Sequence, residues 1–393
     1  MTPAARVQAA IEILDHINQG TAAEKALTTW ARRARYAGSG DRAAVRDHVF
    51  QALRCRRSYA ALGGGTNGRA LMRGALIDAG VALDTVFTGD GHSPAVLDTE
   101  ELTKGRDPAA GAEQGNLPDW LWKRFETALG TGNARLSAQI LQQRAPVTLR
   151  VNSRLSTAPQ AIEILKEDQI TVTSCDLIDT ALIVIEGARR VAGSRAYCEG
   201  YVELQDASSQ AAMAALSVAP GSRVLDYCAG GGGKTLALAA RVTADWFAHD
   251  ANESRMSDLP RRADRSGITV TCLETNAIAD AAPFDLVLCD VPCSGSGTWR
   301  RAPEAKWRLT SERLEELCVL QRDILQDAAS LVAPDGQLAY ATCSLLPEEN
   351  DHQVTRFIDQ HPDWEITLQK SWSISEWGDG FFLASLKRSG QKT

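Results

Sequence analysis

Two cysteines and an aspartate follow buried strands in a way that could bring them together. Asp290 and Cys293 come directly after the apolar run Leu286–Cys289. Cys343 lies two residues after a second such run, Gln337–Ala341. Runs of this kind predict buried parallel strands, and the ligands of an open α/β sheet lie outside the carboxyl ends of its strands. We therefore expect both thiols and the carboxylate at one sheet edge, where a cysteine is better placed to react than to be an inert core residue.

These three groups match what the methylation of carbon 5 of a cytosine requires. Carbon 5 is too poor a nucleophile to accept a methyl group unaided. A thiolate that adds to carbon 6 turns the ring into an enamine-like species whose carbon 5 can attack an electrophilic methyl group. The reaction also needs an acid near N3 and a later base for the carbon 5 proton. Six other cysteines are expected to be inert: Cys55, Cys175, Cys198, Cys272, Cys289 and Cys318.

A glycine-rich loop joins a predicted buried strand to a predicted helix. Its glycines, Gly230–Gly233, permit a tight turn and lack the Cβ that would collide with a closely bound ligand. Gly233-Lys234-Thr235 is similar to the end of a P-loop, which would make the chain an ATPase, but that pattern requires a glycine at the position of Cys228. The dinucleotide pattern also fails, because Leu236 occupies its third glycine position.

S-adenosylmethionine fits this loop better than either nucleotide. It carries no pyrophosphate, so it needs a tight glycine turn but not a nest of phosphate-binding N–H groups. It also needs an acid at the end of the next strand to bind the ribose hydroxyls. Asp250 stands there, directly after the predicted strand Trp246–His249. The alternative interpretation of Asp250 is the N-cap of a helix over residues 252–256.

The chain resembles the Sun family of RNA 5-methylcytosine methyltransferases, in particular its RsmB-like branch. Asp226–Thr235 is similar to the cofactor loop D-x-C-A-A-P-G-G-K-T of that family, with Gly-Gly in place of Ala-Pro. Asp290–Cys293 is similar to D-P-P-C, with a valine in place of the first proline. Tyr340–Ser344, followed by Glu348–Asn350, is similar to the T-C-S and E-N-E segments. The resemblance covers about residues 118–388.

This resemblance implies a role for each matching residue. Cys343 would be the nucleophile at carbon 6, Cys293 would assist product release, and Asp290 would contact the base and the cofactor. The cofactor would be S-adenosyl-L-methionine, with its ribose on Asp250 and its adenine on Asn276. The methionine part would lie on the loop residues Cys228, Ala229, Gly230, Gly231, Gly232, Gly233 and Lys234.

The order of the predicted elements indicates an α/β protein with three regions. Residues 1–115 are predicted to be helical and resemble the NusB-like domain of the RsmB-like branch. Residues 116–205 follow a β-α-β-β order, which predicts a small RRM-like α/β unit of a kind often used on RNA. Residues 206–393 alternate between strands and helices, which predicts a Rossmann-like methyltransferase domain.

The distribution of charge favours RNA as the partner, although the net charge of the chain is −7. Residues 1–73 hold eleven arginines and Lys25 against five acidic residues, a net charge of +7. The segment could bind phosphates, or it could be a solvated helical surface. A second group has stacking faces and phosphate donors near the active site, with a packed loop as the equal alternative: Trp299, Arg300, Arg301, Lys306 and Trp307.

We expect a cytoplasmic monomer without a membrane span or a metal, because no apolar run is long enough and no ligand spacing is present. Small-subunit ribosomal RNA is the expected substrate of this RNA (cytosine-5)-methyltransferase, and transfer RNA is the alternative. A rival from another class is an RNA-binding assembly factor that keeps the cofactor site without catalysis. The presence of both Cys293 and Cys343 argues against that rival.

Overall fold

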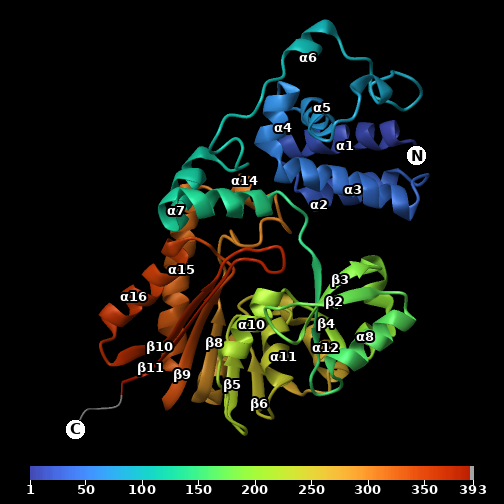
Figure 1. Ribbon diagram of the computed structural model, residues 1–393. Coiled ribbons are helices and arrows are strands. Elements are labelled where there is room, and N and C mark those ends of the chain that lie inside the picture. The colour runs from blue at the N-terminus through green and yellow to red at the C-terminus, as the bar shows by residue number, and fades with distance from the viewer. Residues whose placement is uncertain (390–393) are drawn as a thin grey trace. The chain divides into compact units, whose positions relative to one another are not determined.

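A computed structural model describes residues 1–389 (Figure 1). The chain divides into two compact units. The first comprises Met1–Arg144 and a short segment from much later in the sequence, Trp299–Arg308. The second comprises Ala145–Thr298 and the chain from Leu309 onward. No helix within residues 1–389 is both long enough and apolar enough to cross a membrane.

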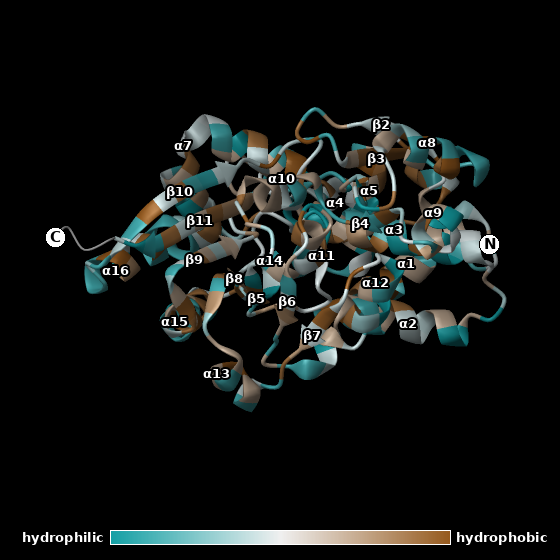
Figure 2. Cartoon of the chain, turned by 90° about the horizontal axis from the view of Figure 1, so that it is seen from below, coloured by the Kyte–Doolittle hydropathy of each residue, from teal (hydrophilic) through white to brown (hydrophobic). Residues whose placement is uncertain are grey.

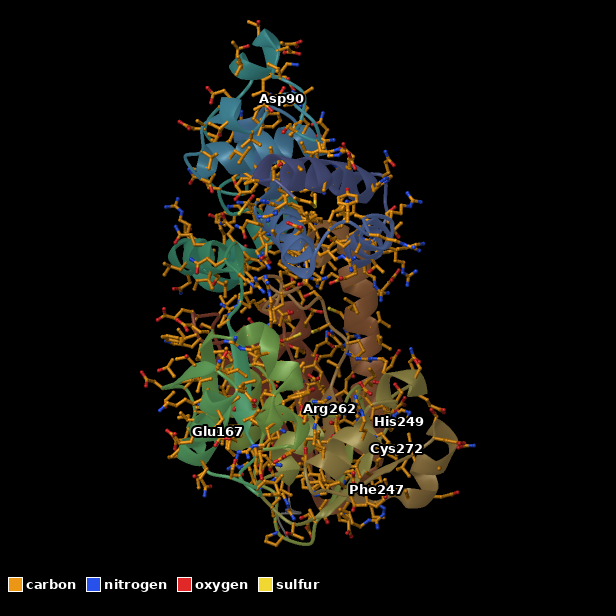
Figure 3. All side chains as sticks on the ribbon, turned by 90° about the vertical axis from the view of Figure 1, so that its right-hand side faces the viewer. Asp90, Glu167, Phe247, His249, Arg262 and Cys272 are labelled. Carbon is orange, nitrogen blue, oxygen red and sulfur yellow. The ribbon has the colours of Figure 1, made fainter. Side chains whose placement is uncertain are left out.

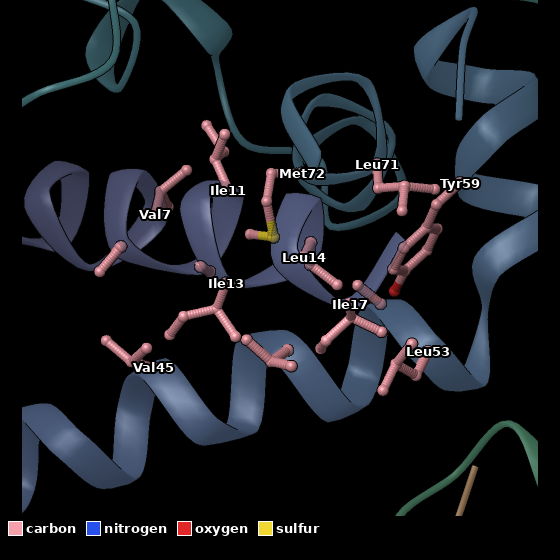
Figure 4. Close-up of a cluster of buried hydrophobic side chains, with 14 of the residues drawn as sticks. Val7, Ile11, Ile13, Leu14, Ile17, Val45, Leu53, Tyr59, Leu71 and Met72 are labelled. Carbon is pink, nitrogen blue, oxygen red and sulfur yellow. The ribbon is translucent and has the colours of Figure 1, made fainter. Parts of the chain in front are cut away.

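The first unit is helical, as the sequence predicted for its N-terminal part. Val7, Ile11 and Leu14 recur at helical spacing on the first helix and belong to one buried apolar cluster with Leu53 and Leu71 (Figure 4). The segment of residues 88–118 contains one short helix, α6. The helices are α1 (Pro3–Asn18), α2 (Ala23–Arg33), α3 (Ser39–Arg54), α4 (Arg56–Gly63), α5 (Gly68–Asp78), α6 (Thr99–Thr103), α7 (Asp119–Leu141) and α14 (Ala305–Arg308).

The second unit begins with a small antiparallel sheet in the strand order β2-β3-β1-β4. The predicted β-α-β-β order is confirmed, and a fourth strand, β4, was missed because it has only three residues and carries a charged one, Glu203. One face of the sheet packs on helix α8 around Leu149 and Leu165. The elements are β1 (Val147–Val151), α8 (Ala158–Glu167), β2 (Thr171–Ser174), β3 (Ala181–Glu186), α9 (Arg195–Cys198) and β4 (Val202–Leu204).

A larger sheet of seven strands follows, in the order β10-β11-β9-β8-β5-β6-β7. The five strands from β9 to β7 are parallel. Next to β9, β11 pairs antiparallel, and β10 in turn pairs antiparallel with β11 at the edge of the sheet. This sheet confirms the predicted Rossmann-like α/β fold. The strands are β5 (Arg223–Asp226), β6 (Asp245–Ala248), β7 (Val270–Cys272), β8 (Phe284–Asp290), β9 (Val332–Thr342), β10 (Trp364–Trp372) and β11 (Phe381–Arg388).

Helices cover the larger sheet and bury their apolar faces on it. The longest, α15, shows both hydrophilic and hydrophobic residues in Figure 2 and buries Leu314, Leu317 and Leu325. Central strands such as β8 are buried along almost their whole length, which explains their continuous apolar sequence. The helices are α10 (Ala207–Ala215), α11 (Gly233–Ala239), α12 (Leu259–Arg265), α13 (Ile278–Ala281), α15 (Ser311–Ser330) and α16 (Asp351–Gln360).

The segment Trp299–Arg308 is packed within the helical unit. Trp299 stacks on Phe125 with ring centroids 5.9 Å apart. Lys306 Nζ donates to the carbonyl of Arg54 at 2.9 Å, and the Trp307 indole donates to the carbonyl of Leu53 at 2.7 Å. These bonds satisfy carbonyls at the C-terminal end of α3, which the helix itself leaves without partners. For Trp299, Arg300 and Lys306, all buried, the packed loop is therefore the correct alternative, and RNA stacking by Trp299 is wrong.

Lys306 generates a prediction about stability and pH, since burial lowers the pKa of its amine to about 7. The unfolded chain keeps that proton up to about pH 10. The contribution of Lys306 to stability therefore rises with pH between about 7 and 10, where the unfolded state binds more protons at this group. Lys306→Met removes this pH dependence but leaves the Arg54 carbonyl without its donor, so the stability of the variant relative to the parent should fall by about 2–3 kcal/mol as the pH rises from 7 to 9.5.

Urea denaturation of the parent and of Lys306→Met at pH 7 and pH 9.5 measures this difference. Lys123→Met, at an exposed site on α7 of the same unit, is the matched control and should change little at either pH. A difference in stability between Lys306→Met and the parent that is the same at pH 7 and pH 9.5 would contradict a buried amine of lowered pKa.

Candidate functional site

The parallel strands β5, β6, β8 and β9 end at one edge of the larger sheet, and the loops beyond them carry the predicted site residues. The glycine-rich loop follows β5, and Asp250 follows β6. Asp290 is the last residue of β8, with Cys293 in the loop after it, and Cys343 directly follows β9. Because β8 pairs directly with both β5 and β9, the order of the strands brings the chemistry-bearing segments into neighbouring positions.

The two cysteines that the sequence singled out lie side by side. Their sulfur atoms, Cys293 Sγ and Cys343 Sγ, are 3.5 Å apart, and both residues are free thiols. A hydrogen bond from Cys293 lowers the pKa of Cys343 and outweighs the opposing effect of burial, with further help from the charge of Lys234. The same hydrogen bond and burial raise the pKa of Cys293 well above its ordinary value. Of the two thiols, Cys343 therefore ionises more readily than Cys293.

A buried glutamate holds the two cysteine loops together. Glu349 accepts hydrogen bonds from the backbone N–H of Ser294 at 2.7 Å and from its hydroxyl at 2.5 Å. It also accepts from the Ser344 hydroxyl at 2.5 Å and from the Gln321 amide at 3.1 Å. Ser294 is next to Cys293 and Ser344 is next to Cys343, so one carboxylate fixes both neighbours of the thiol pair. The backbone adds a direct link, since Gly297 N–H donates to the carbonyl of Cys343 at 2.9 Å.

Asp290 forms an ion pair with Lys234, which is the last residue of the predicted cofactor loop. Burial by itself would lower the pKa of Lys234. The negative charge of Asp290 and its hydrogen bond with the lysine together have the larger effect, so the pKa of Lys234 is raised. Deeper in the sheet, Asp226 accepts a 2.6 Å hydrogen bond from the Thr235 hydroxyl, and burial raises the pKa of Asp226 to about 6. The ion pair between Lys234 and Asp290 therefore connects the loop after β5 with the carboxyl end of β8.

The glycine-rich loop requires glycine at two positions. Gly230 and Gly232 have φ angles of +51° and +74°, a region that residues with a Cβ rarely adopt. At Gly232 a Cβ would also lie 2.1 Å from a methyl carbon of Leu259. The loop therefore passes close over α12 without side chains of its own at these positions.

Asp250 is buried and bonded to this loop. One of its carboxylate oxygens accepts from the N–H of Gly230 at 3.0 Å, and the other accepts from the N–H of Asn252 at 3.0 Å. Arg255 pairs with it at 3.0 Å. The bond to Asn252 is a local turn contact. The short helix that follows, Glu253–Met256, has Asn252 as its N-cap, so the alternative that made Asp250 an N-cap is wrong. The bond to Gly230 ties the end of β6 to the predicted cofactor loop. Asn276 is exposed in a short 3-10 turn after β7, and its role in binding adenine stays a prediction.

Several residues that organise the site were not identified from the sequence. Glu349 lay in a recognised motif, but nothing in the sequence showed which groups it would bond. His249, labelled in Figure 3, bridges the carbonyl of Tyr227 at 2.8 Å and the Thr275 hydroxyl at 3.0 Å. Arg262 and Glu203, which lie 59 residues apart in the sequence, form an ion pair at 2.9 Å. A contact of this kind has no periodic signal, so only the fold reveals it.

Comparisons with known proteins agree with this geometry. Residues 213–387 match the model of the family described as 16S rRNA methyltransferase RsmB/F, and residues 117–192 match the ferredoxin-like domain of RsmF/B-like methyltransferases. The chain is 34% identical to ribosomal RNA small subunit methyltransferase B of Salmonella arizonae, over 68% of this chain and 66% of that protein. It is 30% identical to a probable methyltransferase B of Synechocystis, over 75% and 70% respectively. The chain thus spans about two thirds of the length of these relatives.

A solved structure shows the same fold. A methyltransferase homolog from Pyrococcus horikoshii superposes with a TM-score of 0.60 at 21% identity, over 71% of this chain and 97% of that one.

The bonds of Glu349 generate a prediction about stability. Glu349→Ala leaves buried hydroxyl and amide groups of three residues without their acceptor, which should lower the free energy of unfolding by about 2–4 kcal/mol. Glu349→Gln keeps the size and one acceptor oxygen, so its loss should be smaller. Urea denaturation measures both. A Glu349→Ala variant within 0.5 kcal/mol of the parent, on the order of an ordinary surface substitution, would show that the carboxylate does not hold the loops.

Proposed function

Because the chain belongs to the 16S rRNA methyltransferase RsmB/F family, we propose that it is an S-adenosylmethionine-dependent enzyme that methylates carbon 5 of a cytosine in small-subunit ribosomal RNA. The observation that carries this proposal is the pair of thiols, Cys293 and Cys343, 3.5 Å apart at the carboxyl edge of the sheet. Their unequal proton affinities suit a nucleophile and a proton carrier.

The residues at this edge fit S-adenosylmethionine. Gly230 and Gly232 give the tight turn that a closely bound ligand needs, and Asp250 lies buried at the end of the next strand. Residues 228–234 would hold the methionine part, with Asp290 near it, while Asp250 would bind the ribose and Asn276 the adenine. When bound, the cofactor supplies the electrophilic methyl group.

Cys343 begins the chemistry on the base. Its sulfur adds to carbon 6 of the cytosine, and the electrons of the 5,6 double bond move toward N3. An acid near N3 donates a proton to this nitrogen, so that no negative charge remains on the ring. Asp290 lies near the Cys343 thiol and pairs with Lys234, where it can contact the base edge. Carbon 5 is then nucleophilic and accepts the methyl group.

Cys293 completes the reaction. After methylation, carbon 5 still carries its proton, and the bond between Cys343 and carbon 6 must break. A base that removes this proton returns the electrons to the 5,6 double bond and expels the Cys343 thiolate. Cys293, next to Cys343, is placed to assist that elimination by donating its proton to the departing Cys343 sulfur.

RNA contact is assigned to the helical unit. The exposed residues Arg32, Arg33 and Arg35 lie at the end of α2 and directly after it, in the segment of net charge +7. Ribosomal RNA is favoured over transfer RNA because the relatives are named for the small subunit. Bisulfite sequencing of both RNAs after reaction with the purified protein distinguishes the two substrates.

Replacing each cysteine separates the two roles. Cys343→Ala cannot add to carbon 6, so it should be inactive and form no covalent complex with RNA. Cys293→Ala should still attack and methylate but release slowly, so a protein–RNA species that survives denaturing electrophoresis should accumulate. Both variants should keep their fold, since each loses one small side chain. A complex with Cys343→Ala and none with Cys293→Ala would reverse the roles, and full activity in either variant would reject the mechanism.

A further inference from the structure

The carbonyl groups of the cofactor loop are bonded to arginines that belong to other elements. The carbonyl of Gly231 accepts a short hydrogen bond from Arg262 of α12, a residue labelled in Figure 3. The carbonyl of Gly233 accepts from Arg150 of β1 at 2.9 Å and from the Gln205 amide at 3.1 Å. The loop is therefore held from behind by side chains that point at its backbone.

Arg262 is itself fixed by a buried acid from the small sheet. Its second terminal nitrogen donates to Glu203 of β4 at 2.9 Å. The Glu203 side chain is only 1% exposed and also pairs with Arg265, whose guanidinium lies over the ring of Tyr197 at 4.2 Å. A planar guanidinium with two separate acceptors has little freedom to move, so the position of Gly231 depends on that of Glu203.

This arrangement coincides with a departure of the loop from the family pattern. Gly231 stands where the cofactor loop of the family carries proline, which would fix the backbone of the loop by itself. A Cβ at Gly231 would lie 2.8 Å from a terminal nitrogen of Arg262, so in this chain the guanidinium occupies space beside the loop that a side chain at position 231 would approach. A glycine loop that no other side chain holds would be more mobile. The free energy needed to order it on binding would lower its affinity for any ligand.

We propose that Arg262, held by Glu203, is a positioning residue that fixes the Gly231 backbone for cofactor binding and replaces the rigidity of the missing proline. The inference rests on the proposed binding of S-adenosylmethionine by this loop. It also makes the small sheet a part of the cofactor site, because Glu203 on β4 and Arg150 on β1 both lie in that sheet. Arg262 and Glu203 are not catalytic residues, and they act through the loop.

The test measures the loop and the binding separately, in the full-length chain. Arg262→Gln removes the bridge, so hydrogen exchange over residues 228–234 should become faster in the free protein. Its affinity for S-adenosylhomocysteine in calorimetry should fall about tenfold, the order expected when a hydrogen bond from a charged group is lost. Arg262→Lys keeps the charge but cannot bond both acceptors, so its loss should be intermediate.

Arg261→Gln is the matched control. Arg261 precedes Arg262 on the same helix, is exposed and pairs with Asp258 of its own segment at 3.1 Å. It loses the same charge, and it should leave both the exchange and the affinity unchanged.

The decisive variant is Gly231→Pro in the Arg262→Gln background. The N–H of Gly231 makes no hydrogen bond within the described residues, so proline removes none there, and the shorter glutamine leaves room for its ring. This double variant should regain affinity to within about threefold of the parent, because rigidity returns by another route. With Arg262 intact, Gly231→Pro should not improve binding.

The outcomes separate the proposals. Parent-like exchange and parent-like affinity in Arg262→Gln would overturn the positioning role, while leaving the proposed function in place. Faster exchange in Arg262→Gln without rescue by Gly231→Pro would overturn the replacement of proline. A parent protein that binds no S-adenosylhomocysteine would contradict the proposed function, and with it the inference.

Discussion

The approach of two sulfur atoms to 3.5 Å is the feature on which the rest of this site depends. Two loops from different strands must be held at a fixed separation for this contact, and neither loop is a regular element. Glu349 supplies that constraint, since its carboxylate accepts from residues on both loops and is buried away from water. A buried carboxylate is costly unless its oxygens are hydrogen-bonded, and here the serines adjacent to the two cysteines provide the donors.

The same contact gives two chemically identical side chains different pKa values. One thiol that donates to the other favours the charged form of its partner and the neutral form of itself. Lys234 adds a positive charge on the side of Cys343 and is in turn fixed by Asp290. Thus the glycine-rich loop, the end of β8 and Cys343 form one electrostatic group. The bonds from Arg150 and Arg262 to the loop extend this group to the small sheet.

The sequence predicted most of the fold and the location of the site. Long apolar strands such as β8, and helices with a clear apolar face such as α8, have strong periodic signals, and the motifs around Cys293 and Cys343 indicated the sheet edge at which the two thiols meet. The strands β4 and β7 escaped detection because each has only three residues, and β10 because most of its residues are at least partly exposed. These strands carry little of the pattern that marks a buried element.

What the sequence could not provide were contacts between distant residues. The partners of Glu349, the pairing of Arg262 with Glu203 and the inclusion of Trp299–Arg308 in the helical unit all join segments far apart in the chain. For Trp299 and Lys306, residue type alone suited RNA binding and burial equally well, and only packing decided between them.

The most direct test of the two-cysteine account is a trapping experiment with RNA that contains 5-fluorocytosine. Fluorine at carbon 5 cannot be removed as a proton, so a methylated adduct cannot eliminate and stays attached to the nucleophile. Peptide mapping of the trapped complex by mass spectrometry identifies that residue. The account predicts attachment to Cys343 alone, in the presence of S-adenosylmethionine. Attachment to Cys293, or no adduct with an RNA whose unmodified form is methylated, would contradict it.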